Sequence, residues 1–210
     1  MSKLKALVLN ASLKQTSAGE PSNTGGLSQE VLNIMEDEGA ETEMVRLADY
    51  HIPFGISADL GGEDEWPLIL EKVKEADIVM IGTPIWLGEK SSLAKLAIER
   101  LDGSSSETNE KGQSIFYNKV GGVIITGNED GAKKAASSIL YAQSNLGFLI
   151  PPNVDTYWVG EAGPGPSYLD VDGNNNEFTK GHVKMLAYNT LHLARILKEN
   201  PIPAVGNVMQ

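Results

Sequence analysis

Short apolar runs alternate along this chain with longer segments in which apolar residues recur every three or four positions. The runs predict buried strands at residues 4–9, 43–47, 77–81, 119–126 and 147–150. The periodic segments predict helices that begin near residue 24, cover residues 66–74, and include residues 93–101, 132–140 and 183–197. Apolar strands that alternate with amphipathic helices are typical of a parallel sheet covered on both faces.

Five strand–helix units in 210 residues predict an α/β fold, a doubly wound five-stranded parallel sheet in the flavodoxin-like order 2-1-3-4-5. No repeat or linker divides the chain, so residues 1–210 are expected to form one domain. Residues 102–118 are polar and predict an exposed loop. Residues 151–176 are rich in Gly, Pro and Asn and predict a loop-rich segment before the C-terminal helix. Residues 157–177 are interpreted as a lid, a subunit contact or an irregular surface loop.

The chain is strongly acidic, with 17 Lys and Arg against 28 Asp and Glu and a net charge of −11. We therefore expect no nucleic-acid partner and no anionic membrane partner. The first residues predict a strand rather than a signal peptide, which favours a cytoplasmic location. Cysteine is absent, and His51, His182 and His192 show no metal-ligand spacing, so no metal or iron–sulfur site is expected.

Ligands of doubly wound sheets bind beyond the carboxyl ends of the strands, so the loops after the first, third and fourth strands are the candidates. The first loop, residues 10–24, reads NASLKQTSAGEPSNT and runs into a helix. Its hydroxyls, its lysine and the free N–H groups of the helix start suit a phosphate. The alternative is a plain surface loop in which Ser22 or Asn23 caps the helix. Neither a P-loop nor a dinucleotide fingerprint is present.

The other two loops offer flat and polar groups at the same edge. TPIWLG at 83–88 carries a Trp, which is either core packing or a surface for a flat ligand. TGNEDG at 126–131 carries Asn128, which is either a turn residue or a ligand contact. Taken together, the three loops predict one ligand with its phosphate at the first loop and its ring between the other two.

These motifs resemble those of the NAD(P)H-dependent FMN reductase and iron–sulfur flavoprotein family. NASLK with SNT resembles the family's phosphate loop, TPIWLG its isoalloxazine loop, and TGNEDGA its third flavin loop. The match covers residues 4–150 and continues into the last helix. It departs from the family at Ala11, where Gly is usual, and at Lys14, where Arg is usual. The absence of cysteine excludes the iron–sulfur cluster.

The resemblance implies FMN as cofactor and NADPH or NADH as electron donor. It assigns the phosphate to Ser12, Lys14, Ser22, Asn23 and Thr24, and the isoalloxazine ring to Thr83, Pro84, Ile85, Trp86 and Leu87, whose backbone N–H groups lie near its pyrimidine edge. It assigns the other side of the ring to Thr126, Gly127, Asn128 and Gly131. Trp158 and Tyr168 are candidates for stacking on substrate. No side chain is expected to be catalytic, because flavin N5 accepts the hydride.

Three functions follow, in order of preference. The first is an FMN-dependent NAD(P)H oxidoreductase that reduces a small acceptor such as a quinone, a nitro compound or free flavin. The second is an electron carrier of flavodoxin type, which the acidity favours. The third is a flavin-free regulatory module, disfavoured because the first strand ends in NAS rather than in clustered acidic residues. The resemblance also implies a homodimer or higher homo-oligomer, and it leaves the acceptor and the choice between NADH and NADPH open.

Overall fold

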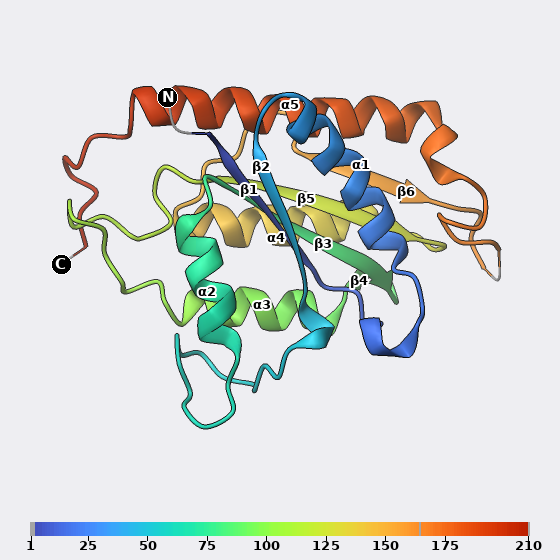
Figure 1. The fold of residues 1–210 in the computed structure, drawn as a ribbon, viewed down its shortest axis with the longest axis horizontal. Coiled ribbons are helices and arrows are strands. Elements are labelled where there is room, and N and C mark those ends of the chain that lie inside the picture. Colours follow the sequence, from blue (N-terminus) through green and yellow to red (C-terminus); the bar gives the residue numbers. More distant parts are fainter. Residues whose placement is uncertain (1–2, 164, 210) are drawn as a thin grey trace.

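A computed structural model describes residues 3–163 and 165–209 of the chain. Five parallel strands form the sheet in the order β2-β1-β3-β5-β6, and the short β4 pairs antiparallel with β3 (Figure 1). Numbered without β4, the parallel strands have the order 2-1-3-4-5, which confirms the predicted flavodoxin-like fold. The strands are β1 (Lys5–Asn10), β2 (Glu41–Arg46), β3 (Ile78–Trp86), β4 (Glu89–Lys90), β5 (Val120–Gly127) and β6 (Asp155–Val159).

Helices cover both faces of this sheet (Figure 1). They are α1 (Asn23–Asp37), α2 (Trp66–Glu75), α3 (Ser92–Asp102), α4 (Ala132–Leu146) and α5 (Glu177–Glu199), with short 3₁₀ turns η1 (Thr16–Ala18), η2 (Leu47–Asp49) and η3 (Gly173–Asn175). One apolar cluster joins α1 and α5 to the sheet, and the other joins α2, α3 and α4. In β1, Leu7 and Leu9 belong to one cluster and Ala6 and Val8 to the other, since successive strand residues point to opposite faces.

The fifth parallel strand is not where the sequence predicted it. Residues 147–150 make only an isolated bridge through Leu149, and Gly147 ends α4 at a positive φ of 114°. Two prolines, at positions 151 and 152, then interrupt the run. The edge strand is β6, whose sequence DTYWV pairs with β5 from Val123 to Gly127. The prediction of a strand at 147–150 was therefore wrong, and the region expected to be loop-rich contains a strand.

The third strand is longer than predicted. It continues past Ile81 to Trp86, so TPIW is strand rather than loop. Thr83 and Pro84 pair with β5, and Ile85 and Trp86 pair with β4. The two-residue turn of this hairpin is Leu87 and Gly88.

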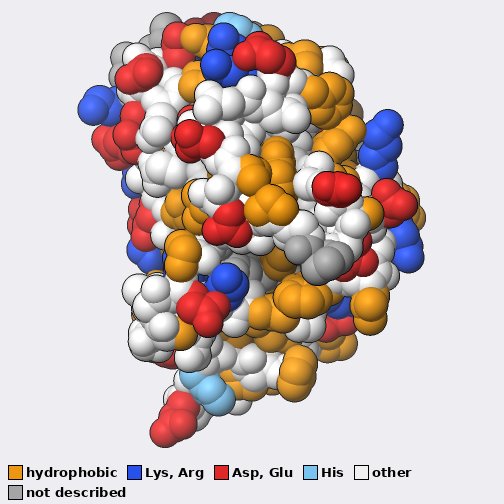
Figure 2. All heavy atoms as spheres, turned by 90° about the vertical axis from the view of Figure 1, so that its right-hand side faces the viewer, with side chains coloured by type: hydrophobic (Ala, Val, Ile, Leu, Met, Phe, Trp, Pro, Cys, Tyr) orange, Lys and Arg blue, Asp and Glu red, His pale blue; other side chains and the backbone are white. Residues whose placement is uncertain are grey.

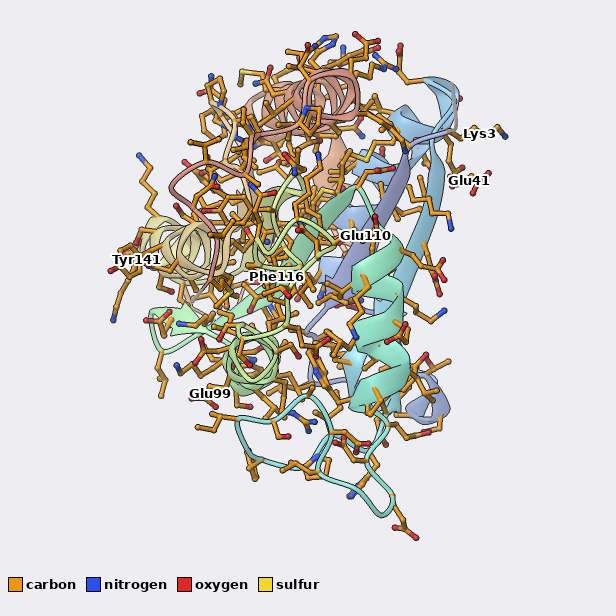
Figure 3. All side chains as sticks on the ribbon, turned by 90° about the vertical axis from the view of Figure 1, so that its left-hand side faces the viewer. Lys3, Glu41, Glu99, Glu110, Phe116 and Tyr141 are labelled. Atoms are coloured by element: carbon orange, nitrogen blue, oxygen red, sulfur yellow. The ribbon has the colours of Figure 1, made fainter. Side chains whose placement is uncertain are left out.

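The loop predicted to be exposed, residues 102–118, is partly buried, and so is the loop at residues 50–65. Phe116 is fully buried and stacks on Phe148 with ring centroids 5.0 Å apart, and Figure 3 shows it in the interior of the end opposite the strand carboxyl termini. The loop 50–65, below α2 and α3 in Figure 3, is fastened by Arg100 of α3. Arg100 forms a bidentate ion pair with Asp64, at 2.6 and 3.2 Å, and both side chains are fully buried. Among the described residues, no helix combines the length and the apolar character needed to cross a membrane.

Candidate functional site

A cavity of about 430 Å³ opens at the carboxyl edge of the sheet, within the size range of small-molecule sites. It lies between the start of α1, the end of β3, the loop after β5 and the segment around residues 163–168. Figure 2 views the molecule from this side and shows hydrophobic side chains gathered across the middle of the face. The described residues that line the cavity are Ser12, Leu13, Lys14, Asn23, Thr24, Pro84, Ile85, Trp86, Thr126, Gly127, Asn128, Glu129, Trp158, Gly163, Ser167 and Tyr168.

At one end of the cavity, α1 begins with a capped first turn. The Ser22 hydroxyl accepts the Gly25 N–H at 2.9 Å, which makes Ser22 the N-cap, and Ser22 itself does not border the cavity. Asn10 supports this cap by donating to the Ser22 hydroxyl at 3.3 Å. The N–H groups of Asn23 and Thr24 have no intrahelical acceptor at this position, and both residues border the cavity. The result is a helix N-terminus that favours an anion.

The residues after β1 complete this end. Ser12 is buried, and its N–H donates to the Asn10 side-chain oxygen at 3.1 Å. Its hydroxyl accepts the Lys14 N–H at 3.4 Å. The Lys14 ammonium lies 3.3 Å from the Glu20 carboxylate, at the surface. Lys14 is the cation among the residues that line the cavity, so positive charge and the helix end share one side of it.

The opposite wall is formed by the end of β3. Pro84, Ile85 and Trp86 border the cavity, and Trp86 is 55% exposed, so its indole is open to a ligand. Thr83 is fully buried and does not border the cavity. Its hydroxyl accepts the N–H of Ser91 at 2.9 Å, and the Ser91 hydroxyl donates to the Ala11 carbonyl at 2.7 Å. Thr83 thus holds β3, the start of α3 and the first loop together.

The third wall follows β5. The hydroxyls of Thr24 and Thr126 lie 2.8 Å apart in a buried hydrogen bond that ties α1 to the end of β5. Gly127 packs against Ile85 so closely that a Cβ there would lie 2.8 Å from the Ile85 side chain. Gly131 packs on Gly88, with a would-be Cβ 2.6 Å from the Gly88 backbone, and does not border the cavity.

Glu129 connects two of these walls, and sequence reasoning missed it. Its carboxylate accepts the N–H of Leu87 at 3.0 Å and that of Gly88 at 3.1 Å. Leu87 has a positive φ of 50°, does not border the cavity and is 93% exposed. The backbone donors expected to face the pyrimidine edge of a flavin are therefore bonded to a side chain in this structure. The glutamate inside TGNEDG, opposite a Gly-containing turn, was the available sequence signal.

The fourth wall is the segment after β6. Trp158 and Tyr168 are both buried, border the cavity and form an edge-to-face pair with ring centroids 5.8 Å apart. Burial, together with the Glu30 and Asp172 carboxylates, raises the pKa of Tyr168 to about 12. Among the described residues, no group accepts from or donates to its buried hydroxyl. Stacking of these two rings on a substrate stays a prediction.

Two asparagines fasten this segment over the cavity. The Asn128 amide donates to the carbonyls of Gly165 and Pro166 at 2.9 and 2.7 Å. The Asn23 side-chain oxygen accepts the Leu169 N–H at 3.0 Å. Side chains expected to contact a cofactor thus hold the neighbouring segment in place. We call residues 160–163 and 165–173 the strap.

A protein-family model described as NADPH-dependent FMN reductase matches residues 4–161, most of the chain. The chain belongs to this family. The resemblance read from the three loops is therefore confirmed. Membership makes the protein a flavin oxidoreductase of flavodoxin-like fold whose flavin is FMN.

Among its relatives, the 8-demethyl-8-aminoriboflavin-5'-phosphate synthase of Streptomyces davaonensis is 39% identical over 207 residues, covering 94% of this chain and 80% of the synthase. The crystal structure of RosB with bound 8-demethyl-8-formylriboflavin-5'-phosphate superposes with a TM-score of 0.87 at 39% identity, covering 95% of this chain and 82% of that one. A stretch of a Mycobacterium bovis protein named divalent metal cation transporter MntH is 42% identical over 201 residues, covering 93% of this chain. The chain spans only 29% of that protein's length.

Most of the residues assigned by the resemblance meet at the cavity of this FMN reductase family member. Those that border it are Ser12, Lys14, Asn23, Thr24, Pro84, Ile85, Trp86, Thr126, Gly127, Asn128, Trp158 and Tyr168. Ser22, Thr83, Leu87 and Gly131 lie behind the wall or outside it. Leu13, Glu129, Gly163 and Ser167 also line the cavity, and no role was assigned to them from the sequence.

Proposed function

We propose that this protein is an FMN-dependent NAD(P)H oxidoreductase that passes a hydride from NADPH or NADH to a small acceptor such as a quinone, a nitro compound or free flavin. The observation that carries the proposal is the division of the cavity into two chemically different ends. A helix N-terminus with hydroxyls and Lys14 forms one end, and Pro84, Ile85 and Trp86 form the other. A phosphate joined to a flat ring is the ligand that such a cavity fits.

The residues at the polar end would hold the phosphate of FMN. The N–H groups of Asn23 and Thr24, the Ser12 hydroxyl and the Lys14 ammonium supply donors and positive charge. Since the whole chain carries a net charge of −11, this local arrangement has to overcome the repulsion between the protein and an anion.

The residues at the other end would hold the ring. The exposed indole of Trp86 and the side chains of Pro84 and Ile85 offer apolar surface, and Gly127 lets Ile85 pack closely against the end of β5. When bound, FMN supplies a ring that accepts a hydride at N5, and the protein orients that ring and excludes water from it. The strap, fastened by Asn23 and Asn128, lines the cavity with Gly163, Ser167 and Tyr168 and would cover the ring on that side.

The test is a visible spectrum of the purified protein after incubation with FMN and desalting, followed by NADPH and then NADH without oxygen. Retained yellow colour that bleaches with a nucleotide supports the proposal and identifies the donor. Retained colour that bleaches only with dithionite supports an electron carrier instead. Loss of all flavin on desalting contradicts the proposal.

A second experiment tests phosphate recognition by comparing the affinities for FMN and riboflavin. Lys14→Gln is expected to weaken FMN binding about tenfold and to leave riboflavin binding unchanged, because riboflavin lacks the phosphate. Lys95→Gln, on the exposed face of α3, is the matched control and is expected to leave both affinities unchanged. Equal loss of FMN and riboflavin affinity in Lys14→Gln would contradict the placement of the phosphate at this end.

A second candidate function is that of an enzyme for which the flavin phosphate is the substrate rather than the cofactor. It is favoured by the synthase relative, at 39% identity over 94% of the chain, and by the RosB structure, whose ligand is a flavin phosphate changed at position 8. The protein would then change the ring methyl group at that position. Mass spectrometry of the flavin recovered after aerobic incubation separates the two functions. An unchanged FMN mass supports the reductase, and a new mass at the ring supports the modifying enzyme.

A further inference from the structure

We propose that Glu129 lowers the redox potential of FMN bound in this cavity, by fixing one negative charge at the ring end. The inference rests on the proposed function and adds a positioning residue to which the resemblance assigned no role. It starts from the two hydrogen bonds of the Glu129 carboxylate, at 3.0 Å from the Leu87 N–H and 3.1 Å from the Gly88 N–H.

These bonds hold the carboxylate at a defined place. Leu87 and Gly88 form a turn with positive φ values of 50° and 76°, a backbone conformation that aims consecutive N–H groups at one acceptor. Gly131 packs directly on Gly88, where even a Cβ would lie 2.6 Å from the backbone. The loop after β5 and the hairpin of β3 and β4 therefore form one unit, with the Glu129 carboxylate between them.

The charge is also unbalanced at this end of the cavity. Among the described residues that line the cavity, only Lys14 and Glu129 are charged, and Lys14 belongs to the phosphate end. Among the described residues, no Lys, Arg or His lies within ion-pair distance of Glu129. Glu129 is half-buried, so solvent screens its charge less than it screens a surface carboxylate.

Reduction of FMN by a hydride adds two electrons and one proton, so the neutral oxidised ring becomes an anion unless a second proton is taken up. A fixed carboxylate at the ring end repels that anion and leaves the neutral oxidised form unaffected. The bound flavin is thereby harder to reduce and, once reduced, a stronger donor to the acceptor. Glu129 acts through this field and through the turn, without exchanging a proton or a bond with the substrate.

The test compares midpoint potentials of the FMN-loaded protein, measured by equilibration with a redox dye during slow reduction. Glu129→Gln removes the charge and keeps one acceptor oxygen for the turn. It is expected to favour reduced over oxidised FMN by on the order of tenfold, which for a two-electron couple is a rise of about 30 mV. Glu129→Ala removes the acceptor as well and is also expected to raise the potential. If one of the two variants fails to fold, the other still tests the inference.

Asp130→Asn is the matched control, since Asp130 is exposed, adjacent and outside the cavity lining. It removes the same charge and is expected to leave the potential unchanged. An unchanged potential in the Glu129 variants, or an equal shift in Asp130→Asn, overturns the inference. Wild-type protein that retains no FMN overturns the proposed function and this inference together, whereas retained FMN with an unchanged variant potential overturns the inference alone.

Discussion

The Thr24 and Thr126 hydroxyls meet in a buried hydrogen bond of 2.8 Å. They join the first turn of α1 to the last residues of β5, and both border the cavity. The bond therefore fixes the distance between the polar end of the cavity, at the start of α1, and the wall formed by the end of β5. Each wall of the site comes from a different loop, so such connections decide whether the walls meet.

Thr126→Val tests this bond. It removes one partner and leaves the buried Thr24 hydroxyl without it, so the free energy of unfolding is expected to fall by about 1–3 kcal/mol. Thr156→Val is the matched control, because the Thr156 hydroxyl is buried with no partner among the described residues. That change is expected to leave stability equal or higher. Urea unfolding measures both, and an equal loss in the two variants would contradict the interpretation.

The Asp64–Arg100 pair predicts a pH-dependent stability. Burial opposes ionisation of Asp64, but bonds from Arg100 and from the Leu60 and Trp66 N–H groups outweigh it and lower the pKa of Asp64 below its ordinary value. The stabilisation is therefore present above the ordinary pKa of about 3.9 and is lost as the pH falls through the lower folded value.

Asp64→Asn is expected to lower the free energy of unfolding by about 3–5 kcal/mol at neutral pH, because it leaves the buried Arg100 charge uncompensated. The difference from wild type is expected to shrink below about pH 4, as the wild-type carboxyl takes up its proton. Glu63→Gln, at an exposed position in the same loop, serves as control and is expected to change little at either pH. Chemical unfolding at several pH values measures the free energies of unfolding. A difference between Asp64→Asn and wild type that does not change with pH would contradict the linkage to ionisation of Asp64.

Asn128→Ala tests the fastening of the strap. Loss of the bonds to Gly165 and Pro166 is expected to speed proteolytic cleavage within the strap and to raise the FMN dissociation rate several-fold. Asn145→Ala removes an asparagine side-chain bond on the exposed face of α4 and is the control. Timed proteolysis and stopped-flow release of FMN measure the two effects. Unchanged rates in Asn128→Ala would show that other contacts hold the strap.

Trp86→Leu separates binding from folding. Since the indole is 55% exposed, its loss is expected to change stability by less than about 0.5 kcal/mol. Loss of a flat partner for the ring is expected to weaken FMN binding roughly tenfold. Tyr141→Leu is the control, because Tyr141 is 73% exposed, is not among the residues that line the cavity and lies at the outer edge of the view in Figure 3. Fluorescence titration with FMN measures the affinities, and equal FMN affinity in the two variants would contradict contact with Trp86.

The alternation of apolar strands and periodic helices predicted the layered fold, the strand order and the edge at which the cavity opens. The layers follow from local rules, since a buried strand needs apolar residues throughout and a covering helix needs one apolar face. The strand order and the position of the cavity were predicted from the doubly wound fold class. The three loops were also readable, because residues that follow parallel strands meet at one edge whatever their sequence separation. A polar N-cap at Ser22 or Asn23 was likewise predictable from residue type, and the structure shows Ser22 in that position.

The tertiary structure decided which of two apolar segments became the edge strand. Residues 155–159 pair with β5 and residues 147–150 do not form the strand, because the pairing depends on where the chain turns after α4. It also decided that Asn23 and Asn128 bind the strap, that Thr83 lies behind the wall, and that Glu129 takes the N–H groups of Leu87 and Gly88. The residue type of a polar side chain allows hydrogen bonds to several different partners. Which of them it bonds depends on distances of about 3 Å between segments far apart in the sequence, and only the packed chain sets those distances.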